Sequence, residues 1–240
     1  METLVQKLTN WIENKVISAK AKGVIIGLSG GIDSAVVAIL CKKAFPDNNL
    51  ALIMPCHSLN KDIEHALSFA KKYDIYYKII DLSKIYDSFI SLLDGKKKYV
   101  NFKLEKANIK PRLRMITLYY FANKLNYIVV GTGNKSELTI GYFTKYGDGG
   151  VDILPLGNLL KSQVIELAKY LEVPYEIIQK PPSAGLWEGQ TDEEEIGISY
   201  KQLDEYLRTG KLNNKMIEKK IQDKINKSAH KRTIPEKPNF

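Results

Sequence analysis

The chain has 240 residues, of which 44% are hydrophobic, and this is enough apolar material for a sizeable core in one large domain. No apolar run approaches the roughly 18 residues that a membrane-spanning helix requires, and Glu2 and Glu13 interrupt the apolar positions that a signal peptide would need. The two cysteines, Cys41 and Cys56, lack the paired spacing of zinc and iron–sulfur sites. We therefore expect a cytoplasmic protein without disulfides or membrane contact, whose residues 1–240 form a single domain.

The net charge of +9 comes from 36 basic and 27 acidic residues, and much of it lies near the C-terminus. Residues 211–232 hold eight basic residues and two acidic ones. Such a segment is typical of an RNA-binding surface, and equally of the solvated face of an amphipathic helix; a small polyphosphate is a third partner that would fit. Apolar residues recur within the segment at helical spacing, so we favour the helix and expect no nucleic acid partner.

The chain alternates apolar runs with segments of helical periodicity. After an amphipathic helix over residues 3–19, we expect strands at 24–28, 50–54, 75–80 and 127–130. We expect helices near 34–45, 61–73, 82–93 and 111–125 between them, then 160–171, 199–208 and 212–229. This order predicts an α/β fold with a doubly wound, mostly parallel sheet of about five strands, helices on both faces and a helical C-terminal part. The loops that follow the first, second and fourth strands should share one rim, where ligands of such sheets bind.

The loop after the first strand has the composition of a phosphate-binding turn. It reads Gly27, Leu28, Ser29, Gly30, Gly31, Ile32, Asp33, Ser34. Adjacent glycines let the backbone approach an anion closely, and the helix that follows offers unpaired N–H groups. No lysine stands where a Walker loop needs one. An ordinary glycine turn with Asp33 or Ser34 as the helix N-cap is the simpler alternative, but the complete pattern after a strand favours phosphate.

Two further loops have little periodicity. The first, residues 141–150, mixes glycines and aromatics with Lys145 and Asp148. The second, residues 180–195, contains Trp187 and resembles a functional lid, because long loops without structure of their own are uncommon in compact domains.

The turn resembles the loop of the ATP-pyrophosphatase superfamily, which has the form Ser-Gly-Gly-x-Asp-Ser. Later blocks are similar to ammonia-dependent NAD synthetases, in matching order over roughly residues 5–235. These blocks are residues 131–137, 142–150, 152–156, Lys161, 182–186 and 230–232. The resemblance implies an AMP-forming ligase for the final step of NAD biosynthesis. In that reaction ATP activates the nicotinate carboxylate of deamido-NAD as an acyl-adenylate, pyrophosphate leaves, and ammonia displaces AMP.

The resemblance also implies roles for particular residues. Residues 27–34, Thr132, Lys161 and Ser183 would contact ATP, with Lys161 stabilising charge at the α-phosphate. Asp33 and Glu137 would be Mg²⁺ ligands, which makes Asp33 and Lys161 the candidate catalytic residues. The residues that would contact deamido-NAD are Arg112, Lys145, Asp152, His230 and Lys231.

Several of these residues have simpler interpretations from sequence alone. Glu137 could be an acid at a helix start, Lys161 a surface charge, and His230 with Lys231 a surface pair, so the last two depend on family order. The family often has threonine at the position of Ser183, which keeps the hydroxyl. Asp148 is a further hypothesis, as a group that positions ammonia or accepts a proton from ammonium.

The nitrogen source and the assembly state follow from the same resemblance. The chain has no room for a glutaminase domain, so free ammonia is the implied donor. The family forms homodimers, which suits the aromatic residues of 111–127, although a buried core helix would look the same. A tRNA-modifying member of the superfamily and a non-catalytic nucleotide-binding module are the alternatives. The first lacks an arrangement of reactive cysteines here, and the second does not account for Asp33 together with Glu137.

Overall fold

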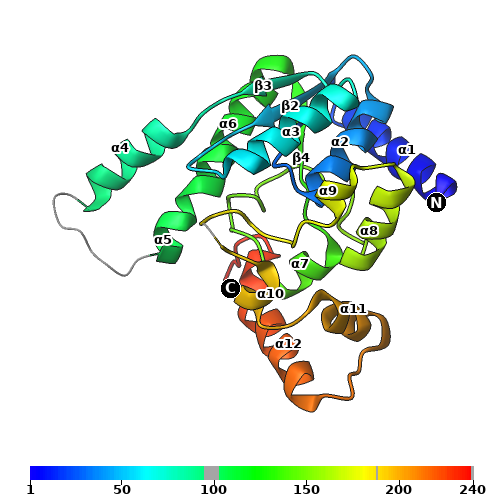
Figure 1. Ribbon diagram of the computed structural model, residues 1–240, viewed down its shortest axis with the longest axis vertical. Coiled ribbons are helices and arrows are strands. Elements are labelled where there is room, and N and C mark those ends of the chain that lie inside the picture. Colours follow the sequence, from blue (N-terminus) through cyan, green and yellow to red (C-terminus); the bar gives the residue numbers. More distant parts are fainter. Residues whose placement is uncertain (95–102, 188, 239–240) are drawn as a thin grey trace.

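The computed structural model describes residues 1–94, 103–187 and 189–238. Its centre is a parallel sheet with strand order β3-β2-β1-β4, covered by helices on both faces (Figure 1). The strands are β1 Gly23–Gly27, β2 Asn49–Ile53, β3 Tyr77–Ile79 and β4 Tyr127–Val130. The doubly wound α/β arrangement predicted from the alternation of apolar runs is confirmed.

The sheet has four strands among the described residues where about five were predicted. In place of a fifth strand, Ile153 forms an isolated parallel bridge with Val130. Pro155 follows two residues later, and a proline has no N–H to continue a ladder. The segment therefore makes only a short contact with the edge of β4.

Alternate residues of the central strands face opposite sides of the sheet. Val24 and Ile26 of β1 join the larger core with helices α1, α2, α3 and α8, whereas Ile25 joins a second core with α6. Helix α4 packs on α6. The bounds of these helices are α1 Glu2–Ser18, α2 Ile32–Ala44, α3 Asn60–Lys72, α4 Ser83–Asp94, α6 Ile109–Leu125 and α8 Lys161–Tyr170. Apolar side chains at successive positions of β1 are thus explained by burial on both faces.

The C-terminal part has a separate small core. Figure 1 shows α11 and α12 projecting below the sheet, and Leu203, Leu212 and Ile221 are buried between these elements and Ile140 of α7. The bounds are α7 Lys135–Ile140, α10 Asp192–Ile196, α11 Tyr200–Thr209, α12 Lys215–Lys227 and η1 Ala229–Lys231. The basic segment is therefore helical with an apolar side, as the spacing of its apolar residues predicted.

The short helices escaped the sequence prediction. They are α5 Lys103–Ala107, α7, α9 Tyr175–Ile178 and α10, each of four to six residues. One turn of helix is too short to show a period of 3.6 residues. Helix α10 begins within the predicted lid of residues 180–195, of which Glu188 is outside the described residues. None of the helices in the described part of the chain combines the length and apolar character of a membrane span.

Candidate active site

A pocket of about 430 Å³ opens at the carboxyl ends of the strands. Leu28, Met54 and Gly131, which follow β1, β2 and β4, all line it. Ser183 of the predicted lid and Thr132 of the loop after β4 line it as well. The three loops predicted to share one rim are therefore together, at the place where parallel sheets bind ligands.

Hydrogen bonds to the side chains of Ser29 and Ser34 stabilise the turn after β1. The Ser34 hydroxyl donates to the Gly31 carbonyl (2.8 Å) and accepts from the Ser29 N–H (3.2 Å), while the Gly31 N–H donates to Ser29 Oγ (3.3 Å). Gly31 is the N-cap of α2 and has no side chain to cap it. The alternative in which Asp33 or Ser34 caps the helix is therefore wrong. The helix N–H groups and its dipole instead face the pocket, where an anion can bind them.

Gly30 has a different role from the rest of the turn. Its φ of +78° is in the left-handed region, and a Cβ there would lie 2.4 Å from the Asp62 carbonyl oxygen of α3. It is not among the pocket-lining residues. Glycine at this position allows the turn to pass close to α3.

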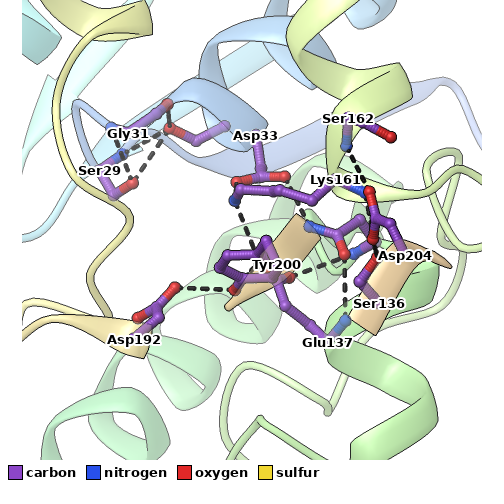
Figure 2. Close-up of polar contacts among 12 residues, drawn as sticks. Ser29, Gly31, Asp33, Ser136, Glu137, Lys161, Ser162, Asp192, Tyr200 and Asp204 are labelled. Atoms are coloured by element: carbon purple, nitrogen blue, oxygen red, sulfur yellow. Dashed lines mark hydrogen bonds and ion pairs between the residues drawn. The ribbon is translucent and has the colours of Figure 1, made fainter. Parts of the chain in front are cut away.

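Three charged side chains from three elements meet in the pocket (Figure 2). Lys161 Nζ, at the start of α8, lies 2.5 Å from Asp33 Oδ2 of α2 and 3.2 Å from Glu137 Oε1 of α7. Asn134 ties the two acids together, because its amide donates to Asp33 Oδ1 (2.9 Å) and its N–H donates to Glu137 Oε2 (3.2 Å). Lys161 is only 2% exposed, so its interpretation as a surface charge is wrong.

Burial and charge oppose one another in this cluster. Burial raises the pKa of the Glu137 carboxyl to about 7, although the Lys161 ammonium acts in the opposite direction. Burial alone would lower the pKa of Lys161, but Asp33 and Glu137 outweigh it and raise that pKa above its ordinary value. Lys161 is thus a permanent cation at the wall of the pocket.

The C-terminal part adds two residues that the sequence analysis missed. The Tyr200 hydroxyl lies 2.9 Å from Asp192 Oδ2 and 3.3 Å from Glu137 Oε1, and Lys161 Nζ lies 5.2 Å from the centre of the tyrosine ring. Burial raises the pKa values of both Tyr200 and Asp192. Asp192 stands in a run of four acids at residues 192–195, which as a sequence looks like a solvated helix start and gives no signal of burial.

A third missed residue, Asp204 of α11, connects the neighbours of Glu137 and Lys161. Its Oδ1 accepts from the Ser136 hydroxyl (2.5 Å) and its Oδ2 from the Ser162 N–H (2.9 Å). Ser136 Oγ in turn accepts from the Lys161 N–H (3.0 Å). Asp204 is 4% exposed, so a buried and fully bonded carboxylate fixes α7 relative to α8 (Figure 2).

We expect Asp204→Asn to lower the free energy of unfolding by about 1–3 kcal/mol, because an amide cannot accept on both sides and one buried donor loses its partner. Turnover should fall with it, since Glu137 and Lys161 lose their common support. Urea denaturation and steady-state kinetics check this, with Glu205→Gln on the exposed side of the same helix as the matched control. Wild-type values for both quantities would contradict the positioning role.

The residues predicted to contact deamido-NAD divide into two groups. Lys231 lines the pocket, where its Nζ donates to the Gly141 and Phe143 carbonyls (2.7 and 2.8 Å). Arg112, Lys145 and His230 are not among the pocket-lining residues. They cluster together, since Lys145 Nζ donates to the His230 carbonyl (2.6 Å) and Arg112 donates to the Lys145 carbonyl (3.4 Å).

Asp152 and Asp148 have clear partners within the chain. Asp152 Oδ2 accepts from the Val129 N–H (2.7 Å) and Oδ1 from the Tyr119 hydroxyl (2.9 Å), so it stabilises the end of β4 outside the pocket lining. Asp148 does line the pocket, and its Oδ1 accepts from the Thr144 N–H (2.9 Å). Desolvation by the surrounding protein raises the pKa of Asp148. The predicted substrate roles of both residues stay predictions.

What the sheet, the turn and the pocket define together is an α/β enzyme that binds a nucleotide at the carboxyl edge of a parallel sheet. Comparison with known proteins narrows this class to a family. The family model described as NAD synthase matches residues 4–235. The NH3-dependent NAD⁺ synthetase of Carboxydothermus hydrogenoformans is 52% identical over 239 residues, covering 99% of this chain and 97% of that protein.

Solved structures agree with the sequence match. An NMN synthetase from Francisella tularensis superposes with a TM-score of 0.94 at 43% identity, covering 100% of this chain and 98% of that one. An NH3-dependent NAD synthetase from Campylobacter jejuni gives a TM-score of 0.81 at 35% identity, covering 99% and 98%. The chain belongs to the NAD synthase family.

Proposed function

We propose that the pocket converts deamido-NAD to NAD with ATP and free ammonia, releasing AMP and pyrophosphate. The chain is an ammonia-dependent NAD synthetase, the ligase of the final step of NAD biosynthesis. Relatives that carry this name match it over nearly their whole length. The observation that carries the residue assignment is Lys161, which is buried between Asp33 and Glu137 beside the turn of residues 27–34. That arrangement supplies what an adenylation needs: donors for phosphate and fixed positive charge.

In the first half-reaction a carboxylate oxygen attacks the α-phosphate of ATP. Two anions must approach, so the Lys161 ammonium neutralises charge that develops at the α-phosphate. The N–H groups of the turn and the start of α2, with Ser29 and Ser34, hold the departing pyrophosphate. Thr132 and Ser183, which also line the pocket, contact the rest of the nucleotide. In the second half-reaction ammonia attacks the acyl carbon, and AMP leaves.

The donor set fits Mg²⁺ as well as it fits a lysine. Asp33 and Glu137 present carboxylate oxygens to one shared cation, Lys161 Nζ, and these are the hard ligands that Mg²⁺ prefers. Among the described residues no group of three or more candidate ligands exists, which suits an ion that takes one or two carboxylates and completes its shell with phosphates and water. Asp33 and Glu137 would hold the ion, which when bound neutralises phosphate charge.

Arg112, Lys145, Asp152, His230 and Lys231 are proposed to bind deamido-NAD. We further propose a homodimer in which the dinucleotide site draws on both subunits. Large apolar side chains stand exposed along α6 and α4, as a contact between copies would require. Their exposures are Ile116 59%, Tyr120 60%, Ile85 53% and Leu92 81%. A cytoplasmic location is proposed from the two free cysteines, which are both buried.

A second candidate substrate is the acid mononucleotide that corresponds to NMN. The observation that favours it is the NMN synthetase structure, whose TM-score of 0.94 exceeds the 0.81 of the Campylobacter jejuni NAD synthetase. Amide formation would follow the same two half-reactions, because the nicotinate carboxylate is common to both substrates.

The test is a product assay with Mg²⁺, ATP and ammonium, run in parallel with the dinucleotide and the mononucleotide acid. We expect AMP, pyrophosphate and NAD as products, and a faster reaction with ammonium than with glutamine as the nitrogen donor. ADP and orthophosphate in place of AMP would overturn the adenylation chemistry. Turnover of the mononucleotide alone would make the second candidate the function.

A further inference from the structure

One carboxylate oxygen in the pocket has no hydrogen-bond partner among the described residues. Asp192 begins α10, is 4% exposed and lines the pocket, and its Oδ2 accepts from the Tyr200 hydroxyl. Its Oδ1 is buried and finds no donor within the part of the chain that the structure describes. A buried anionic oxygen without a donor is costly, so its presence inside a binding pocket points to a partner that arrives from outside.

The surroundings of Asp192 favour a small cation. Asp33, Glu137 and Glu195 also line the pocket, and the nearby cation Lys161 is already paired with Asp33 and Glu137. Two tyrosine hydroxyls lie near Asp192. That of Tyr200 donates to Oδ2, and that of Tyr142 donates to Glu195 (2.9 Å) and is close enough to Asp192 to oppose the rise that burial causes in its pKa. Carboxylates and phenol hydroxyls thus surround an oxygen that has no donor among the described residues.

We infer that Asp192 Oδ1 is the acceptor that captures the ammonium ion, in a subsite bordered by Tyr142 and Tyr200. Ammonium offers four N–H donors, which suit a carboxylate oxygen and phenol oxygens. A divalent ion fits less well, since Asp33 and Glu137 already provide two carboxylates for Mg²⁺, whereas Asp192 offers a single free oxygen. The inference rests on the proposed function and assigns the binding position of the nitrogen donor.

The position accounts for where the nitrogen must be delivered. Asp192 shares the Tyr200 hydroxyl with Glu137, so the captured ion lies beside the cluster at which the adenylate forms. Asp192 also belongs to the loop over the pocket, with its N–H donating to the Pro182 carbonyl (2.9 Å).

Asp192→Asn tests the inference, because it removes the charge and keeps the shape. We expect the KM for ammonium to rise by roughly 10- to 100-fold, as loss of a charge-assisted hydrogen bond implies. Exchange of labelled pyrophosphate into ATP with deamido-NAD, which needs no nitrogen donor, should remain within about twofold of the wild type. Hydroxylamine is uncharged at neutral pH, so it should react in the Asp192→Asn variant at nearly the rate that it shows in the wild type. Glu194→Gln, an exposed neighbour with the same change of charge, is the matched control.

A measurement on the unaltered enzyme guards against a variant that does not fold. Rubidium ion, similar in size to ammonium and unable to react, should compete with ammonium and leave pyrophosphate exchange intact. An unchanged KM for ammonium in Asp192→Asn overturns the inference. An equal fall in the rate of exchange and in the rates with ammonium and with hydroxylamine overturns it too. So does a raised requirement for Mg²⁺ with an unchanged KM for ammonium. Absence of exchange in the wild type would instead defeat the proposed function, so the two failures are distinguishable.

Discussion

Lys161→Met is expected to lower the rate of pyrophosphate exchange by roughly 10²- to 10³-fold or more, the range found when one preorganised charge-stabilising donor is removed. Methionine keeps the apolar stem in place, so the packing of α8 survives. The loss falls on the ammonium, which is buried and lies within ion-pair distance of Asp33 and Glu137. If pyrophosphate exchange stops while nucleotide binding is still detectable, the defect lies in the chemical step.

The same substitution leaves Asp33 and Glu137 facing each other without a cation. Removing one partner of a buried ion pair costs about 3–5 kcal/mol, so the free energy of unfolding without nucleotide should fall measurably. Burial holds the pKa of Glu137 above its ordinary 4.5, and losing Lys161 raises it further. A raised carboxyl pKa means that the folded state binds more protons, so the destabilisation should be greater at about pH 8 than at about pH 5.5.

Lys169→Met, on the exposed side of the same helix, is the control for both effects. Urea denaturation at the two pH values and the exchange assay give the comparison. Wild-type exchange in Lys161→Met would remove the lysine from the adenylation step. A destabilisation that is independent of pH would contradict the electrostatic account of the cluster.

The sheet was predictable from sequence because its signal is local. Ile25 and its neighbours in β1 are buried on both faces, and such strands are continuous apolar runs. The residues that end or interrupt structure were harder to place. Pro155 follows the isolated bridge at Ile153, so the expected fifth strand does not form. Whether a short apolar run forms a strand depends on the strand that lies beside it, and the sequence alone does not identify that neighbour.

The site was predictable only in part, for a similar reason. The family pattern identified Asp33, Glu137 and Lys161, and the structure brings all three together. Tyr200 contacts Glu137 from 63 residues away in the chain, and Asp204 contacts Ser136, the neighbour of Glu137, from 68 residues away. They lie on α11, whose apolar spacing predicts a helix and a buried side but does not reveal that a carboxylate stands on that side. Long-range burial of polar groups has no local signature.

Asp33→Asn is the second substitution with a large expected effect. We expect turnover to fall by roughly 10²- to 10³-fold and the fold to remain intact, since the amide has nearly the same shape. The substitution places a neutral amide where two carboxylate oxygens now accept from Asn134 (2.9 Å) and from Lys161. Circular dichroism, unfolding curves and the product assay check these outcomes, with the exposed Asp47→Asn as the control for the change of charge.

The decisive measurement for Asp33 is the dependence of the residual rate on Mg²⁺. If Asp33 and Glu137 hold one ion together, the single substitutions Asp33→Asn and Glu137→Gln should each raise the Mg²⁺ concentration needed for half-maximal rate. The double variant should then cost less than the sum of the single costs, because residues that act as a unit are not additive. Additive losses would mean that the two carboxylates act separately. Full activity in Asp33→Asn would remove it from the metal role altogether, and Lys161 would remain as the sole charge at the α-phosphate.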